Sequence, residues 1–166
     1  MYVWHTLYVF KHRSITVGGT FWPLHRGHKT LLQEAFADGL EVFIGLTSDR
    51  MISSKNRSGA IPSYGKRKRS LLAYLEEMDY SDRSHVFRIE DEYGFAADFP
   101  NLQAITITER TRTNAEKINQ RRIARGMTPL DIIQIKLVKA EDGVPISSSR
   151  VRAGIIDDEG HLPDRS

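Results

Sequence analysis

The stretch Gly18–His28 reads GGTFWPLHRGH, and it decides the fold because it joins a predicted strand to a predicted helix. The strand covers residues 14–18, and apolar residues at helical spacing follow from Gly27 onward. Glycines let the backbone turn tightly and approach a ligand closely, and a helix start presents free N–H groups to an anion. We predict that His25 and His28, three positions apart, point at one polyphosphate and stabilise charge that develops on it.

Two other interpretations of His25 and His28 follow from their spacing alone. The rings could lie on the surface at a helix start, or they could be two of three ligands of a metal ion. The Gly-Gly-Thr-Phe sequence that precedes them after a strand favours phosphate chemistry, and no third residue is well placed to complete a zinc site.

The rest of the chain alternates apolar runs with helical patterns, which is typical of βαβ units around a parallel sheet. We predict an α/β fold, a Rossmann-like doubly wound parallel sheet of about five strands in a single domain. Its ligands are expected at the carboxyl ends of the strands. The predicted strands are residues 14–18, 41–46, 85–89, 104–108 and 131–138, and the predicted helices are residues 27–38, 64–78, 114–125 and a short one from about residue 148.

The expected domain covers residues 14–166, and residues 1–13 are an N-terminal extension without an assigned structure. Residues 47–63 are expected to form a long polar loop, and loops of that length are often functional. A chain of 166 residues is long enough for one compact domain with its own core.

The composition excludes several classes of function. The absence of cysteine excludes disulfides, thiol catalysis and cysteine metal sites. No apolar run is long enough to span a bilayer, and the opening residues lack the basic region and cleavage site of a signal peptide. We therefore expect a cytoplasmic protein. The net charge of +3 reflects 24 basic against 21 acidic residues, so local clusters of charge are more informative than the total.

A second strand-to-helix junction follows the fifth predicted strand. Residues 144–152 read VPISSSRVR. One serine would cap the helix, but three in a row supply more hydroxyls than a cap needs. With Arg152 one helical turn further on, these serines predict a second anion-binding site.

The two junctions together resemble the HxGH nucleotidyltransferase superfamily, in which the chain is most similar to archaeal-type phosphopantetheine adenylyltransferase. The matching residues are Gly19-Thr20-Phe21, Pro23, His25, Gly27-His28 and Ile146-Ser147-Ser148-Ser149. Supporting stretches are residues 45–49, 94–96, 126–130 and 147–154. The resemblance runs from about residue 14 to residue 162.

The resemblance implies that the partners are ATP and 4′-phosphopantetheine, which give dephospho-coenzyme A and pyrophosphate with Mg²⁺. It implies catalytic roles for His25, His28 and Lys55. The implied ATP-binding residues are Gly19, Thr20, Phe21, His25, His28, Asn119, Ser147, Ser148, Ser149 and Arg152, and the implied acceptor-binding residues are Thr20, Lys55 and Thr108. The acceptor is already an ionised phosphate, so the protein has to align it and neutralise the transition state. Mg²⁺ would be held by ATP oxygens and water, without protein ligands.

The chain departs from the family pattern at two places. Trp22 stands where the family usually has aspartate. Residues 108–114 read TERTRTN where close relatives tend to have Ser-Glu-Glu-Thr-Tyr-x-Gly, which introduces Arg110 and Arg112 near the expected nucleotide. These arginines could contact phosphate or be solvated.

Three alternative functions follow from these features. The chain could be another adenylyl- or cytidylyltransferase that acts on nicotinamide mononucleotide or a phosphoalcohol. It could bind nucleotide without turnover because Trp22 impairs catalysis. It could also bind nucleic acid through residues 66–69 and 121–125, but no interleaved aromatic residues offer a stacking platform. We expect neither a nucleic-acid nor a membrane partner, and the oligomeric state stays open.

Overall fold

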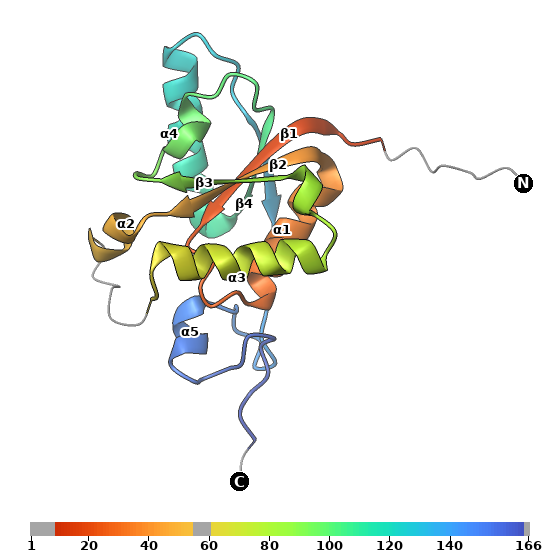
Figure 1. Cartoon of the computed structure of the whole chain (residues 1–166), viewed down its shortest axis with the longest axis vertical. Helices are drawn as coiled ribbons and strands as arrows, with labels where there is room; N and C mark the ends of the chain where they lie inside the picture. The colour runs from red at the N-terminus through yellow and green to blue at the C-terminus, as the bar shows by residue number, and fades with distance from the viewer. Residues whose placement is uncertain (1–8, 55–60, 165–166) are drawn as a thin grey trace, which may run out of the picture.

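The computed structural model describes residues 9–54 and 61–164 and contains one five-stranded parallel sheet with the order β3-β2-β1-β4-β5 (Figure 1). The strands are β1 (His12–Gly19), β2 (Gly39–Thr47), β3 (Ser84–Ile89), β4 (Ala104–Thr108) and β5 (Asp131–Ile135). The α-helices are α1 (Arg26–Asp38), α2 (Asp49–Ser54), α3 (Tyr64–Glu77), α4 (Arg112–Ala124) and α5 (Ser148–Arg152). Short 3-10 helices are η2 (Ser81–Arg83), η3 (Gly94–Ala97) and η4 (Glu109–Thr111).

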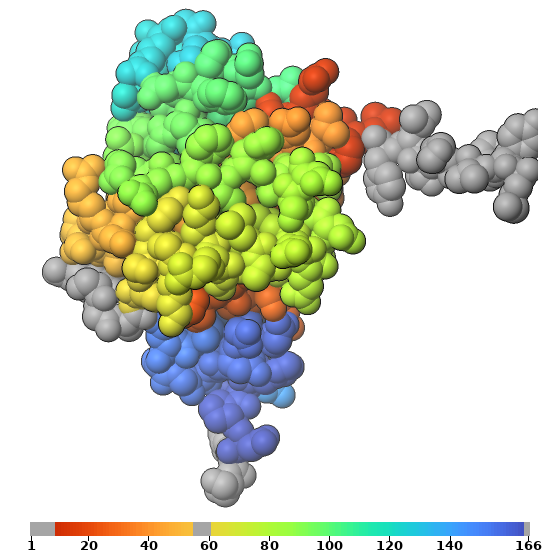
Figure 2. Space-filling model, in the orientation of Figure 1, coloured from red at the N-terminus to blue at the C-terminus, as the bar shows by residue number. Residues whose placement is uncertain are grey.

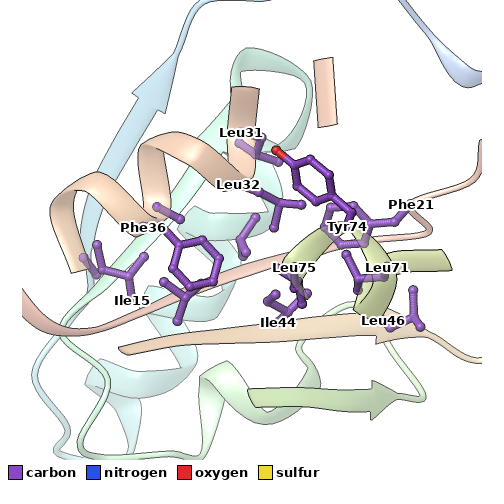
Figure 3. Packing of buried hydrophobic residues seen from close by; sticks show 14 residues of the cluster. Ile15, Phe21, Leu31, Leu32, Phe36, Ile44, Leu46, Leu71, Tyr74 and Leu75 are labelled. Carbon is purple, nitrogen blue, oxygen red and sulfur yellow. The ribbon is translucent and has the colours of Figure 1, made fainter. Parts of the chain in front are cut away.

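Helices cover both faces of the sheet, as the alternation of side chains along each strand requires. In β1, Ile15 and Val17 point into a core shared with α1 and α3, and Figure 3 shows this packing. On the opposite face, Ile105 and Ile107 of β4 pack against α4 and η3. The predicted Rossmann-like α/β fold with about five parallel strands is therefore confirmed.

The strand order places a crevice at the carboxyl ends of β1 and β4. From β1 the chain proceeds outward through β2 to β3, and it then returns to the other side of β1 with β4 and β5. The two halves of a doubly wound sheet diverge at such a point, which is where these sheets bind ligands. The stretch Gly18–His28 leaves the sheet at this crevice.

The structure differs from the sequence-based element bounds by one or two residues at several element ends, and three differences are informative. Strand β1 begins two residues earlier, at His12, because it pairs with Gly39 of β2. The fifth strand ends at Ile135 because residues 138–146 fold back on themselves, with Ala140 N–H donating to Val144 C=O. Residues 47–63 are not loop throughout: α2 forms where Ser48 caps its first turn through the Met51 N–H, and Met51 and Ile52 are buried.

Two arginines from the basic clusters of the sequence are fully buried. Arg67 donates to Pro62 C=O, Thr20 C=O and the Thr47 side chain and carbonyl, and it pairs with Asp49. Arg122 is surrounded by main-chain carbonyl groups, those of residues 96, 99, 100, 102 and 128. Neither side chain is available to a phosphate on the surface, which weakens the nucleic-acid alternative.

The C-terminal segment from α5 onward lies against the start of α1. The Arg26 N–H donates to Asp158 C=O, and Lys29 pairs with Glu159 at 2.8 Å. This segment is blue in Figure 2, next to the first half of α3 in that view. Within residues 9–54 and 61–164 the structure has no helix with the length and apolarity needed to cross a membrane.

Candidate active site

The first cavity has a volume of about 500 Å³ and lies at the carboxyl ends of β1, β4 and β5. It brings together both junctions singled out by the sequence, although more than a hundred residues separate them. The polar residues that line it are Thr20, His25, His28, Thr108, Arg110, Lys136, Ser147, Ser148, Ser149 and Arg152. Cations, hydroxyls and imidazoles thus converge on one space, as binding of a polyphosphate requires.

His25 and His28 are held as a rigid pair at the start of α1. Their rings stack with centroids 3.7 Å apart. The Nδ1 atom of His25 accepts from the His28 N–H at 3.3 Å, and the Nδ1 atom of His28 accepts from the His25 N–H at 3.4 Å. A ring nitrogen that accepts carries no proton, so the reciprocal bonds assign the proton of each neutral ring to Nε2. Each imidazole is therefore left with one N–H donor that the helix start does not use.

Gly27 makes this arrangement possible. A Cβ atom at this position would lie 3.0 Å from Cε1 and 3.1 Å from Nδ1 of the His25 ring. Contacts that short would require the ring to move. The glycine of the HxGH pattern therefore leaves room for the first histidine, as its position between the two rings predicts.

Both histidines are uncharged at neutral pH. Burial, together with a smaller effect of the positive form of His25, lowers the pKa of His28 to about 3. Burial also lowers the pKa of His25 to about 4, with a contribution from the charge of Arg110. The pair therefore stabilises negative charge as neutral hydrogen-bond donors.

A second cavity of about 480 Å³ opens at the same crevice between β1 and β4, with residues of η3 and α4 on one side and Leu31 of α1 on the other. It shares three residues with the first cavity, namely Thr20, Thr108 and Arg110. Apolar side chains form much of its wall, among them Leu31, Met51, Ile89, Tyr93, Phe95 and Ile118. Two lining residues carry buried polar atoms without a hydrogen-bond partner, Thr106 Oγ1 and Asn114 Oδ1. Such atoms are rare in proteins and indicate a ligand or water that completes them.

The family model described as cytidylyltransferase-like matches residues 16–154, which include both cavities' principal motifs. The chain belongs to the cytidylyltransferase-like family. Phosphopantetheine adenylyltransferase of Pyrococcus furiosus is 42% identical over 151 residues, which cover 91% of this chain and 94% of that protein. Phosphopantetheine adenylyltransferase of Methanothermobacter thermautotrophicus is 41% identical over 155 residues, or 93% and 92% of the two chains. The resemblance predicted from the two motifs is confirmed.

A solved structure agrees with this membership of the cytidylyltransferase-like family. A crystal structure described as a protein with unknown function from Archaeoglobus fulgidus superimposes with a TM-score of 0.66 at 31% identity. The match covers 74% of this chain and 88% of that one.

Among the residues that the structure describes, three predicted site residues do not line the first cavity. Asn119 lines neither cavity, because its side chain is bonded to both main-chain groups of Leu130, at 2.7 and 2.9 Å. Phe21 is fully buried, and its ring packs against that of His28 with the centroids 5.3 Å apart. Gly19 lines the second cavity. Lys55 lies outside the described residues.

The serines divide their roles between the helix and the cavity. Ser147 caps α5 by accepting from the Arg150 N–H, and its hydroxyl lies 3.1 Å from that of Ser149. All three serines line the first cavity. Arg152, which also lines the cavity, donates to the Trp22 carbonyl at 3.4 Å and so ties the second junction to the first.

Sequence reasoning missed two residues that shape the site of this family member. Lys136, just after β5, lines the first cavity, and its place at the carboxyl end of a predicted strand was the available signal. Arg67 holds Thr20 and Thr47 at the ends of β1 and β2, and no local signal distinguishes it from its basic neighbours. Trp22, where the resemblance led us to expect an aspartate, lines the first cavity, and the Lys66 ammonium lies 5.6 Å from its ring centroid.

The low pKa values of the two histidines predict a pH dependence of stability. In the unfolded chain both titrate near pH 6.5, whereas in the folded chain they titrate near 4 and 3. Below pH 6.5 the unfolded state therefore binds more protons than the folded state. The stability that the two neutral histidines contribute is fully present above pH 6.5 and is lost as the pH falls through 4 and 3. Urea unfolding at pH 7.5, 5.5 and 4.5 should show a steeper loss in the wild type than in a His25→Asn, His28→Asn double variant. Equal losses would contradict the assigned pKa values.

Proposed function

We propose that this chain transfers AMP from ATP to 4′-phosphopantetheine, giving dephospho-coenzyme A and pyrophosphate in coenzyme A biosynthesis. The observation that carries the proposal is the pair of cavities that meet at Thr20, Thr108 and Arg110. An adenylyltransferase needs two adjacent sites, because the acceptor must attack the α-phosphorus of ATP from outside the nucleotide site. The archaeal relatives named phosphopantetheine adenylyltransferase support the choice of acceptor.

The chemistry of each cavity matches one substrate. The first cavity offers cations, three serines and the histidine donors, which suit the triphosphate of ATP. The second cavity offers apolar walls and the two unpartnered atoms Thr106 Oγ1 and Asn114 Oδ1. A pantetheine arm is a chain of apolar carbon segments interrupted by amide groups, which can pair with a hydroxyl and an amide oxygen. We assign ATP to the first cavity and the pantetheine arm to the second.

The reaction then needs alignment and charge stabilisation, with no covalent intermediate. A phosphate oxygen of the acceptor forms a bond to the α-phosphorus, and the bond from that phosphorus to the bridging oxygen breaks. Pyrophosphate leaves with the electron pair. The Nε2–H groups of His25 and His28 donate to phosphate oxygens as the charge moves, and they need no change of protonation because both rings are neutral.

The residues that line the first cavity also fit a magnesium complex of ATP. Its described lining contains no carboxylate, and within residues 9–54 and 61–164 no three His, Asp or Glu side chains gather as metal ligands. Mg²⁺ accepts such a site because it keeps several waters and binds substrate phosphates. When bound, it would neutralise phosphate charge, while Ser147 to Ser149 and Arg152 would hold the remaining oxygens.

Pyrophosphate release tests the proposed reaction directly. The protein is incubated with ATP, Mg²⁺ and either 4′-phosphopantetheine or nicotinamide mononucleotide. Release with phosphopantetheine alone would support the proposal and show that Trp22 is tolerated. Release with the mononucleotide alone would keep the chemistry and overturn the acceptor. Release with neither would contradict the proposal for this chain, and the variant Trp22→Asp would then show whether the tryptophan is responsible.

Thr106→Val tests the assignment of the second cavity. The substitution keeps the shape of the side chain and removes a hydroxyl that has no protein partner, so the fold should lose no stability. Loss of one hydrogen bond to the acceptor should raise its KM about three- to tenfold, with the KM for ATP within about twofold of the wild type. Thr16→Val, on the neighbouring strand and in the same cavity, serves as a control for stability only, because its hydroxyl already donates to Phe43 C=O and its loss should reduce stability. An unchanged acceptor KM in Thr106→Val would remove this residue from the acceptor site.

Lys55→Ala tests the role that the family resemblance gives to this lysine. If Lys55 holds the acceptor phosphate, the KM for 4′-phosphopantetheine should rise by about tenfold or more, because a charged hydrogen bond is lost. The KM for ATP should change much less. An equal effect on both constants would move Lys55 out of the acceptor site.

A further inference from the structure

Arg110 lies where the two cavities join. It belongs to η4, directly after β4, and therefore stands at the carboxyl end of a strand that borders the crevice between β1 and β4. Arg110 lines both cavities, as do Thr20 and Thr108. Of these three shared residues, it alone carries a charge. A guanidinium at this place faces the point where the acceptor phosphate and the α-phosphate of ATP would meet.

The charge of Arg110 is not neutralised by the protein. Within residues 9–54 and 61–164 the structure shows no hydrogen bond or ion pair of its side chain, and the side chain is exposed. Arg112, two residues later, is different: it pairs with Glu116 at 3.1 Å and donates to Gln134 at 2.8 Å. One arginine of this turn is held by the protein, and the other has all its donors free.

An electrostatic contact links Arg110 to the histidine pair. Its positive charge contributes to the low pKa of His25, after the larger effect of burial. Arg110 and His25 both line the first cavity. Arginine presents a planar fork of N–H donors that matches two phosphate oxygens at once.

We propose that Arg110 is a catalytic residue that binds the acceptor phosphate and the transferred α-phosphate across the junction of the two cavities. The inference rests on the proposed adenylyl transfer and adds a residue to it. As the acceptor oxygen bonds to the α-phosphorus and the bond to pyrophosphate breaks, both phosphates carry negative charge close together. A fixed cation between them offsets this repulsion without gaining or losing a proton.

The test compares Arg110→Ala and Arg110→Lys with the control Arg112→Ala. We expect Arg110→Ala to lower kcat by about 10²- to 10³-fold, as loss of one transition-state donor typically does. The kcat of Arg110→Lys should lie between those of Arg110→Ala and the wild type, because lysine keeps the charge but lacks the planar pair of N–H donors. The kcat of Arg112→Ala should stay within about twofold of the wild-type value. Equal kinetics of Arg110→Ala and Arg112→Ala would overturn the inference.

Titration with ATP alone separates this inference from the proposed function. We expect Arg110→Ala to bind ATP about tenfold more weakly than the wild type and Arg112→Ala. If the wild type failed to use 4′-phosphopantetheine, the acceptor would be wrong, but weaker ATP binding in Arg110→Ala would still support the phosphate contact. Unchanged ATP affinity together with unchanged turnover would show that Arg110 is only a solvated side chain.

Discussion

His28→Asn is expected to lower kcat by about 10²- to 10³-fold with little change in the free energy of unfolding. The Oδ1 atom of asparagine can take the place of Nδ1 and accept from the His25 N–H, so the start of α1 stays capped. The side chain ends before the position of Nε2, so the donor to phosphate is lost. Steady-state kinetics and urea unfolding of the same preparation measure the two effects separately.

His28→Gln is the matched control, because glutamine places an amide nitrogen near the position of Nε2 and has no acceptor at that of Nδ1. We expect it to retain more turnover than His28→Asn and to lose more stability. The opposite ranking of turnover would show that the capping bond matters for catalysis and that the Nε2 donor does not. Unchanged kcat in both variants would defeat the role assigned to His28.

Arg122→Met is expected to reduce the free energy of unfolding by about 3–5 kcal/mol. Methionine fills part of the buried volume but cannot donate to the carbonyl groups that Arg122 now satisfies, including those of Ala96, Phe99 and Thr128. Each buried carbonyl without a partner costs about 1–3 kcal/mol. Desolvation lowers the pKa of Arg122. Main-chain carbonyl groups, and not a carboxylate, surround its charge.

Arg121→Met provides the control one position earlier on α4. Arg121 lies over the Tyr93 ring, 4.8 Å from its centroid, and is only half-buried. Its replacement should reduce the free energy of unfolding by less than about 1 kcal/mol, which is the size of an exposed cation–π contact. Urea unfolding of the two variants measures the difference. Similar losses in both would mean that the carbonyl groups around Arg122 find other partners.

The fold and the first cavity could be predicted because their signals are local. Gly27, His25 and His28 lie within four residues, and Ser147 caps the helix that begins with Ser148 and Ser149. Phosphate binding at a strand-to-helix junction depends on such short segments. The predicted bounds of an element were wrong where pairing with a distant segment decides them, as at the start of β1 and the end of β5.

The buried arginines and the second cavity could not be predicted, because their partners come from distant parts of the chain. Arg67 stands in the run Lys66–Arg69, which has the appearance of a solvated basic patch. Its acceptors belong to residues 20, 47, 49 and 62. The second cavity is likewise formed by β1, β4, η3 and α4 together. Asn119 is the opposite example: this polar residue on a basic helix donates to the Leu130 carbonyl and accepts from the Leu130 N–H.

The shared wall at Thr20, Thr108 and Arg110 has a consequence for inhibition. A molecule that carries an adenosine phosphate at one end and a pantetheine arm at the other fills both cavities at once. Once one end is bound, the other experiences an effective concentration in the millimolar range or above, so the two affinities reinforce each other. The reaction product is such a two-headed ligand. The enzyme should therefore be slowed by its own product, and tethered analogues of the two substrates should be its most potent inhibitors.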